Sequence, residues 1–294
     1  MSGASESTRR RVLDALRRDP LAVGGTLVLL LLVVVGVAGP WLAPSGVNDV
    51  DVDAMLRPPS GAHPFGTDEL GRDVLSRVLV AARVSLQVGV VSVGIALVAG
   101  VTLGLFAGYY RGWLDSVLMR CMDVLFAFPV LLLAVAIVAV LGPGLLTAMV
   151  AIGVVYTPIF ARITRAGVLA VREQVFVRAA VSIGASDLRI MRRHVLPNIA
   201  APLIVQTSLS LAFAILSEAA LSFLGLGIQP PAPAWGRMLF DGRGFVTDAW
   251  WLGVFPGAAI FLTVLAFNLV GDALRDVLDP RQLTLSEARR STTA

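Results

Sequence analysis

Long apolar runs separated by short polar segments dominate this chain and predict membrane-spanning helices. A spanning helix requires roughly 20 mostly apolar residues, and the short alternating segments of a membrane barrel are not seen here. We expect six spans, at residues 21–43, 84–109, 119–141, 144–161, 199–226 and 251–271. The third and fourth form one apolar run, which a turn at Leu141-Gly142-Pro143-Gly144 divides. The predicted fold class is an all-α polytopic membrane protein.

Composition supports this class and excludes several others. The 294 residues are 56% hydrophobic and 15% charged, which is too apolar for a soluble protein. All 24 basic residues are Arg, so the chain lacks the Lys of a Walker A loop and the Lys of a Schiff-base enzyme. The single Cys121 excludes an internal disulfide and a cysteine metal cluster. We expect His63 and His194 on opposite sides of the membrane, and therefore no metal site.

The distribution of Arg predicts the orientation. With the amino terminus inside, 18 Arg residues fall in cytoplasmic segments and 6 in outer segments. The positive-inside rule then places both termini in the cytoplasm. The expected order is a tail (1–20), a first transmembrane anchor (21–43), an outer loop (44–83), a five-helix core (84–275) with a cytoplasmic loop at 162–198, and a second tail (276–294). The first span is longer than the apolar region of a usual signal peptide, so we expect an uncleaved anchor.

The end of the outer loop carries a helical pattern from His63 to Leu86. Asp68 with Arg72, and Asp73 with Arg77, have the favourable acid-first spacing of four residues. We expect an amphipathic, solvated helix that leads into the second span, with one apolar face formed by Leu70, Val74, Leu75, Val78 and Leu79.

Small residues recur every four positions in the second span. Such a stripe lets another helix approach closely, and Gly253 and Gly257 repeat the motif beside Pro256. We expect ordinary bundle packing here rather than a sliding interface. The stripe consists of Ser92, Ala96, Gly100, Gly104 and Gly108.

Residues 176–198 form a basic segment with a helical pattern between two apolar runs. Ser186 is a plausible N-cap for a second short helix, and Leu196-Pro197 is expected to stop that helix. Gly184 lies where the two helices would bend. A bent pair of helices on a cytoplasmic face is suited to docking in a cleft of another protein. Its expected apolar face is Val177, Ala180, Val181, Gly184 and Leu188.

The order Arg178-Ala179-Ala180, three residues, Gly184, nine residues, His194, one residue, Leu196-Pro197 resembles the EAA loop of ABC-importer permeases. It departs from the general pattern in having Arg178 in place of Glu and His194 in place of an aliphatic residue. Both departures are similar to the peptide and nickel branch of that family. Three further blocks resemble the same branch, at residues 65–86, 218–239 and 271–281.

The resemblance covers nearly the whole chain and implies the C-type permease of a dipeptide, oligopeptide or nickel importer, with the type I ABC-importer permease fold. It implies that the protein is located in the bacterial inner membrane. The partners that it implies are a second, homologous permease, two ATP-binding subunits, an extracytoplasmic substrate-binding protein and membrane lipid. No catalytic residue, no cofactor and no nucleic acid are expected for this chain, because ATP and Mg would bind the partner subunits. A nickel permease, a secondary transporter or channel, and a membrane enzyme are the alternatives.

The resemblance also implies which residues contact the ATP-binding subunit. We expect Ala179, Ala180 and Gly184 to pack in its cleft, and Arg178 and Asp187 to set the register by charge. The full predicted coupling set is Arg178, Ala179, Ala180, Gly184, Ala185, Asp187, Leu196 and Pro197.

Glu218 and the outer loop at 228–250 each have two possible interpretations. Glu218 is the one acidic residue well inside a span, and such a carboxylate faces either the substrate path or a packed helix interface. The loop at 228–250 contains Pro230, Pro231, Pro233, Trp235 and Trp250. It could contact a binding protein, or its Trp residues, with Trp251, could lie at the membrane interface.

Overall fold

A computed structural model describes residues 19–278, and in that range the regular structure is entirely helical. The predicted tails therefore lie almost wholly outside the described residues. The elements are α2 (Pro20–Leu42), α3 (Val74–Tyr110), α4 (Gly112–Phe126), α5 (Val130–Leu141), α6 (Leu145–Arg172), α7 (Val175–Ser182), α8 (Asp187–Ile190), α9 (Ala200–Phe223), α10 (Trp235–Gly242) and α11 (Trp251–Leu278).

Five helical stretches are long and apolar enough to span a membrane, and a bent pair brings the total to six. The bent pair is α4 with α5, whose axes differ by 93°. The predicted third span at 119–141 is therefore a bent pair of helices and not one continuous helix. Pro129 has no N–H to continue the α4 hydrogen-bond ladder, so α5 begins as a new helix after it.

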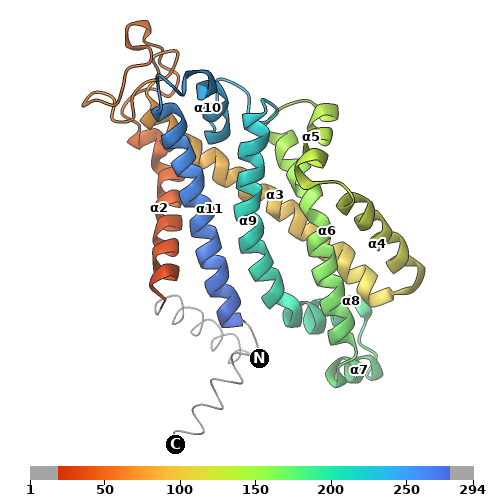
Figure 1. The fold of residues 1–294 in the computed structure, drawn as a ribbon. Helices are drawn as coiled ribbons and strands as arrows, with labels where there is room; N and C mark the ends of the chain where they lie inside the picture. The colour runs from red at the N-terminus through yellow and green to blue at the C-terminus, as the bar shows by residue number, and fades with distance from the viewer. Residues whose placement is uncertain (1–18, 279–294) are drawn as a thin grey trace, which may run out of the picture.

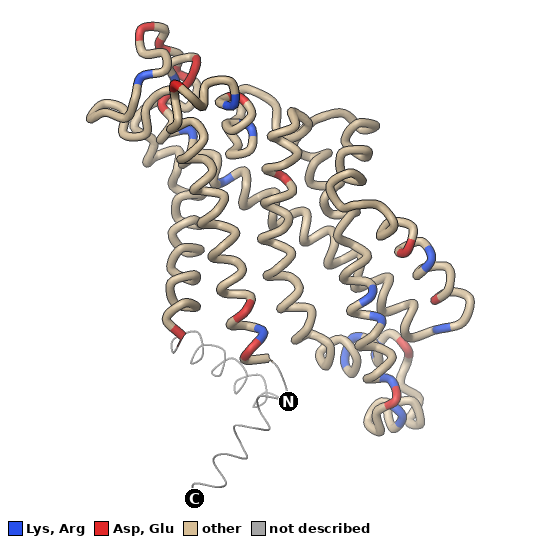
Figure 2. The backbone as a smooth tube through the Cα atoms, in the orientation of Figure 1, with Lys and Arg blue, Asp and Glu red and all other residues tan. Residues whose placement is uncertain are grey.

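The helices form a bundle that α3 crosses obliquely (Figure 1). Helices α2 and α11 pack together at one side, α9 lies between α11 and α6, and α3 contacts all four. Charged residues gather towards the two ends of the bundle and along α4, and the middle of the bundle is largely uncharged (Figure 2). This distribution is the one expected for a polytopic membrane protein.

The small-residue stripe of α3 packs against α6, as predicted. A Cβ atom at Gly100 would lie 2.5 Å from the Phe160 Cβ, and one at Gly104 would lie 2.5 Å from the Ala161 carbonyl oxygen. Only glycine permits this approach of two backbones. The equivalent prediction for α11 is wrong, since a Cβ at Gly253 or Gly257 would meet nothing within 4 Å. The close contact of α11 with α9 instead occurs at Gly271, against Ser208.

The outer loop differs from its prediction. Residues 63–73 are not helical, because Asp73 is the N-cap of α3 and accepts a hydrogen bond from the Ser76 N–H. Gly66 and Gly71 have positive φ angles (75° and 73°), which bend the chain before this cap. Of the predicted apolar face, Val74 and Val78 are buried in α3, whereas Leu70 is exposed.

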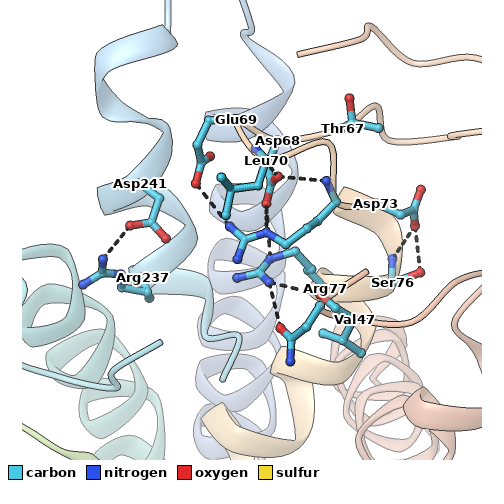
Figure 3. Close-up of polar contacts among 12 residues, drawn as sticks. Val47, Thr67, Asp68, Glu69, Leu70, Asp73, Ser76, Arg77, Arg237 and Asp241 are labelled. Carbon is cyan, nitrogen blue, oxygen red and sulfur yellow. Dashed lines mark hydrogen bonds and ion pairs between the residues drawn. The ribbon is translucent and has the colours of Figure 1, made fainter. Parts of the chain in front are cut away.

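The charged side chains at the start of α3 are buried rather than solvated (Figure 3). Asp68 accepts from the Arg72 Nε at 2.7 Å and lies 3.6 Å from the Arg77 Nε. Asp73, which was expected to pair with Arg77, faces the His63 Nδ1 at 3.0 Å. The ion pairs thus fasten the outer loop to the first turn of α3. Burial raises the pKa of Glu69 at the edge of this cluster.

Two of the outer tryptophans pack inside the protein. Trp235 is buried and donates its Nε1–H to the Val78 carbonyl oxygen at 3.0 Å. Trp251 is buried and donates to the Thr67 carbonyl oxygen at 2.9 Å. The prediction of membrane-interface anchors is wrong for both. Only Trp250 of the three is exposed.

The α3–α6 contact generates a first prediction. Gly104→Leu should lower the unfolding free energy by at least about 1–3 kcal/mol, because the new side chain meets backbone atoms that cannot move aside. Gly94→Leu is the matched control on the same helix, since a Cβ there meets nothing within 4 Å. Thermal unfolding in detergent measures both. Equal stability of the two variants would contradict the packing described here.

The buried ion cluster generates a second prediction. Asp68→Ala leaves Arg72 and Arg77 without their shared carboxylate and should cost about 3–5 kcal/mol. Asp123→Ala removes the partner of Arg162 at a pair whose side chains are about half exposed, and should cost at most about 1 kcal/mol. Denaturation of both variants in the same detergent tests this difference, and the reverse order would refute it.

Candidate functional site

The predicted bend is present at one end of the bundle. Helices α7 and α8 and the turn between them form an elbow, residues 175–190, that lies beyond α6 (Figure 1). Gly184 in the turn has a φ of 79°, a conformation that costs other residues about 1–2 kcal/mol. A Cβ at this position would meet nothing within 4 Å, so the turn requires glycine for its backbone angle and not for space.

The second half of the elbow differs from its prediction. Ser186 occupies the N-cap position of α8, but its side chain makes no capping hydrogen bond. Pro197 does not stop the helix. The chain passes through a π turn (Met191–Val195) and a 3₁₀ turn (Leu196–Ile199) directly into α9. Because Pro197 supplies no N–H, a change of hydrogen-bond pattern lets the helix continue past it.

The elbow is buried on one side and exposed on the other. Val177 and Ala180 pack into the hydrophobic core of this chain, so the prediction that Ala180 enters a partner's cleft is wrong. Ala185 and Leu196 are half-buried against the same core, whereas Ala179, Gly184 and Pro197 are exposed. The exposed side carries large apolar side chains: Val175, Val181, Ile183 and Leu188. An apolar group of this kind at a protein surface typically marks a contact with another protein or with a membrane.

Polar contacts fix the elbow to the ends of α6 and α3. Glu173 follows α6 and accepts from Arg178 and from Arg111, each at 2.9 Å. The hydrogen bond from Arg178, followed by the charge of Arg111, holds the pKa of this carboxyl below its usual value. Asp187 accepts from the Tyr109 hydroxyl at 2.9 Å. Both charges that were expected to set the register with a partner are thus already engaged within the chain.

A surface groove of about 560 Å³ lies between α7 and the end of α3. Its walls include Tyr109, Arg172, Arg178 and Asp187, and Arg172 donates to the Tyr109 carbonyl oxygen. The groove adjoins the exposed apolar side of the elbow at Val181. The elbow therefore offers both an apolar ridge and a polar recess.

Helix α6 continues to Arg172 instead of ending at residue 161, and its extra turns carry charges that contact α4. Arg165 makes a bidentate ion pair with Asp115, in which its Nε donates to Oδ1 at 2.5 Å and its Nη2 donates to Oδ2 at 2.6 Å. Arg162 pairs with Asp123 at 2.7 Å and lies over the ring of Phe126. The sequence pattern did not predict this link between α6 and α4. The acid residues of α4 gave a signal for it, because they recur on one helix beside a segment rich in Arg.

Glu218 is enclosed at the outer end of α9. Its side chain is fully buried, and the Ser222 hydroxyl donates to its Oε1 at 2.7 Å. The Ile228 N–H donates to the same hydroxyl, which joins α9 to the loop before α10. The Glu218 Oε2 has no hydrogen-bond partner within residues 19–278. This carboxyl group does not line an open cavity.

Metal-binding geometry is not found in the described part of the chain. No group of three or more His, Cys, Asp or Glu side chains converges between residues 19 and 278. His63 faces Asp73, and His194 lies in the π turn near the ring of Phe176.

Two family descriptions match the chain. Residues 100–284 match "binding-protein-dependent transport system inner membrane component", and residues 7–59 match "N-terminal TM domain of oligopeptide transport permease C". The first covers more than half of the chain, including the elbow, α9 and Glu218.

Relatives with similar sequences span almost the same length. The chain is 46% identical to the dipeptide transport system permease protein DppC of Alkalihalophilus pseudofirmus, over 92% of this chain and 90% of that protein. It is 50% identical to the di/tripeptide transport system permease protein DppC of Pseudomonas aeruginosa, over 88% of each chain. It is 49% identical to the glutathione transport system permease protein GsiD of Escherichia coli, over 90% of this chain and 88% of that protein.

A solved structure supports the fold. A chain of the MetNI methionine ABC transporter, in an inward-facing conformation, superposes with a TM-score of 0.56 at 18% identity. It covers 69% of this chain and 96% of the other chain. With the helical bundle, the elbow and these matches together, the chain belongs to the binding-protein-dependent transport system inner membrane components, and it is a multi-pass permease of the bacterial inner membrane with the type I ABC-importer fold.

Proposed function

We propose that this chain is one permease subunit of an ATP-driven importer of short peptides. The exposed apolar side of the elbow is the observation that carries the coupling part of this proposal. The relatives named for dipeptide, tripeptide and glutathione transport support the substrate class. The permease itself has no catalytic residue, and a second, homologous permease forms the other half of the path. A peptide-binding protein delivers substrate at the outer face, and both termini of this chain lie in the cytoplasm.

ATP hydrolysis belongs to two partner subunits in this proposal. The chain contains no Lys, so it cannot form a Walker A loop, and ATP and Mg bind the partners. Val181, Ile183 and Leu188 are the apolar residues that enter the partner's cleft, together with the exposed Ala179 and Gly184. This set replaces Ala180, which faces inward. Arg178 and Asp187 hold the elbow in shape through Glu173 and Tyr109.

Movement of the elbow passes to the bundle through ion pairs. Glu173 links α7 to Arg111 at the end of α3, and Arg165 links α6 to Asp115 of α4. When ATP draws the two partner subunits together, both permeases rotate from the inward-facing to the outward-facing arrangement. The elbow is held to the bundle mainly by Val177 and Ala180, which pack in the core, and the partly exposed ion pairs add to this attachment.

The coupling proposal predicts the effect of a bulky residue in the turn. Gly184→Trp in the assembled transporter should abolish peptide uptake while the partner subunits still hydrolyse ATP. Gly112→Trp is the matched control, since Gly112 also has a positive φ (64°), also has nothing within 4 Å of a Cβ, and lies outside the elbow. Uptake by proteoliposomes and phosphate release measure the two activities. Equal uptake by both variants would refute the coupling role of the elbow.

Purification in mild detergent tests the partners separately. The intact chain should copurify with an ATP-binding subunit and a second six-span protein. Recovery of this chain alone, together with solute transport by this chain alone in liposomes, would instead support the secondary transporter that the sequence left open.

We propose that Glu218 joins α9 to the outer loop and does not contact substrate. It is fully buried, and its one hydrogen bond runs to Ser222. Glu218→Gln should retain stability and uptake, because the amide oxygen can still accept from Ser222. Glu218→Ala should lower stability by about 2–5 kcal/mol, as other truncations that leave a cavity do. Normal stability of Glu218→Gln with loss of uptake would assign Glu218 to the substrate path.

A further inference from the structure

A cavity of about 630 Å³ lies between the inner ends of α6, α9 and α11. Ile163 of α6 and Leu278 of α11 form its sides, and one face of α9 forms its floor. No residue of α3 lines it, and α3 crosses behind these helices in Figure 1. The cavity therefore opens on the side of the bundle that α3 does not cover.

The lining residues of α9 and of the 3₁₀ turn before it have a regular helical spacing. Asn198, Pro202, Gln206 and Leu209 follow one another at three or four residues, so they share one side of the helical stretch. From Asn198 to Gln206 the helical rise is about 12 Å, at 1.5 Å per residue. An extended dipeptide or tripeptide is roughly 7–11 Å long, at about 3.3–3.6 Å per residue. Asn198 and Gln206 are therefore too far apart to bind the same terminal group, and an extended short peptide is of about the length that separates them.

The side-chain amides of Gln206 and Asn198 each have a carbonyl oxygen that can accept a hydrogen bond from a ligand. The Gln206 Nε2 donates to the Ser210 hydroxyl at 3.1 Å, and the Asn198 Nδ2 donates to the His194 carbonyl oxygen at 2.7 Å. Their carbonyl oxygens accept no hydrogen bond from residues 19–278. Lipid cannot satisfy such groups, so a polar face on a spanning helix meets water, substrate or protein.

A guanidinium lies at the cytoplasmic end of the same cavity. Arg275 of α11 is exposed and lines the cavity, and it forms no ion pair with the described residues. Asp272 and Asp276 are its acidic neighbours on α11, and neither lines the cavity. The lining thus combines two carbonyl acceptors with one cation.

We propose that this cavity is a substrate-contact site of the transport path, and that its ligand is a zwitterionic short peptide. The Gln206 carbonyl oxygen accepts a hydrogen bond from the peptide's ammonium group, and Arg275 at the cytoplasmic end of the cavity binds its carboxylate. The apolar lining accommodates varied side chains, as ligand cavities with few polar groups do. The inference rests on the proposed function and deepens it by naming the contacts.

The same lining argues against nickel as the substrate. Nickel sites use imidazole, thiolate or carboxylate ligands, and the cavity contains no His, Cys, Asp or Glu side chain among the residues that line it. Of the substrates that the family resemblance leaves open, a zwitterionic short peptide is the one that fits these groups.

Thiol labelling of the assembled, ATP-free transporter in inside-out vesicles tests the site. The exposed Cys121 is first replaced by Ser, and Ala201→Cys is then introduced, because Ala201 lines the cavity but makes none of the proposed contacts with the peptide. A charged, membrane-impermeant thiol reagent should label this position. Alanyl-alanine at ten times its Kd should slow labelling about tenfold, since about one-tenth of the sites remain free. Asp276→Cys is the control, because Asp276 of α11 is exposed near the same end of the bundle but lies outside the cavity, and the dipeptide should not change its labelling.

Every other outcome overturns the proposal. Labelling that the dipeptide does not slow shows a water-filled space without substrate contact. Labelling only by a membrane-permeant reagent shows a lipid-facing surface, and a disulfide from Ala201→Cys to the second permease shows a packed interface. A transporter that takes up peptide and fails this test refutes only the site. A complex that takes up no peptide at all, with the wild-type chain, refutes the proposed function itself.

Discussion

The close contact of α3 with α6 is the constraint on which the rest of the structure depends. Lipid supplies no hydrophobic drive between helices, so association requires dense packing. Gly100, Gly104 and Gly108 let the α3 backbone approach α6 where no other residue would fit. This contact sets the position of α6, and α6 in turn carries both the elbow and the charges that hold α4.

Charge performs a second task at both ends of this packed bundle. At the outer end, Asp68 binds two arginines and fastens a long loop to α3. At the inner end, Glu173 and Arg165 connect the elbow, α6, α3 and α4. These contacts tie the outer loop and the elbow to the ends of the bundle.

Long-range contacts explain where the sequence predictions failed. The outer helix was predicted from spacing alone, but Asp68 and Asp73 bind groups that spacing cannot reveal: two arginines for the first, His63 and a helix N-terminus for the second. Pro197 was expected to end a helix, yet the π and 3₁₀ turns carry the chain past it. Ala180 was expected to face a partner, but the core beneath α7 decides which side of that helix is buried.

The amino-acid sequence by itself determined the class of protein, most of the spans, the stripe on α3 and the bend at Gly184, since each depends on local composition, periodicity or backbone freedom. Only the tertiary structure decided which residues of the elbow are exposed, how α4 bends and pairs with α6, and that Glu218 is enclosed. It also brought Asn198, Gln206 and Arg275 to one cavity. These features depend on which distant segments meet, and a pattern along one chain does not contain that information.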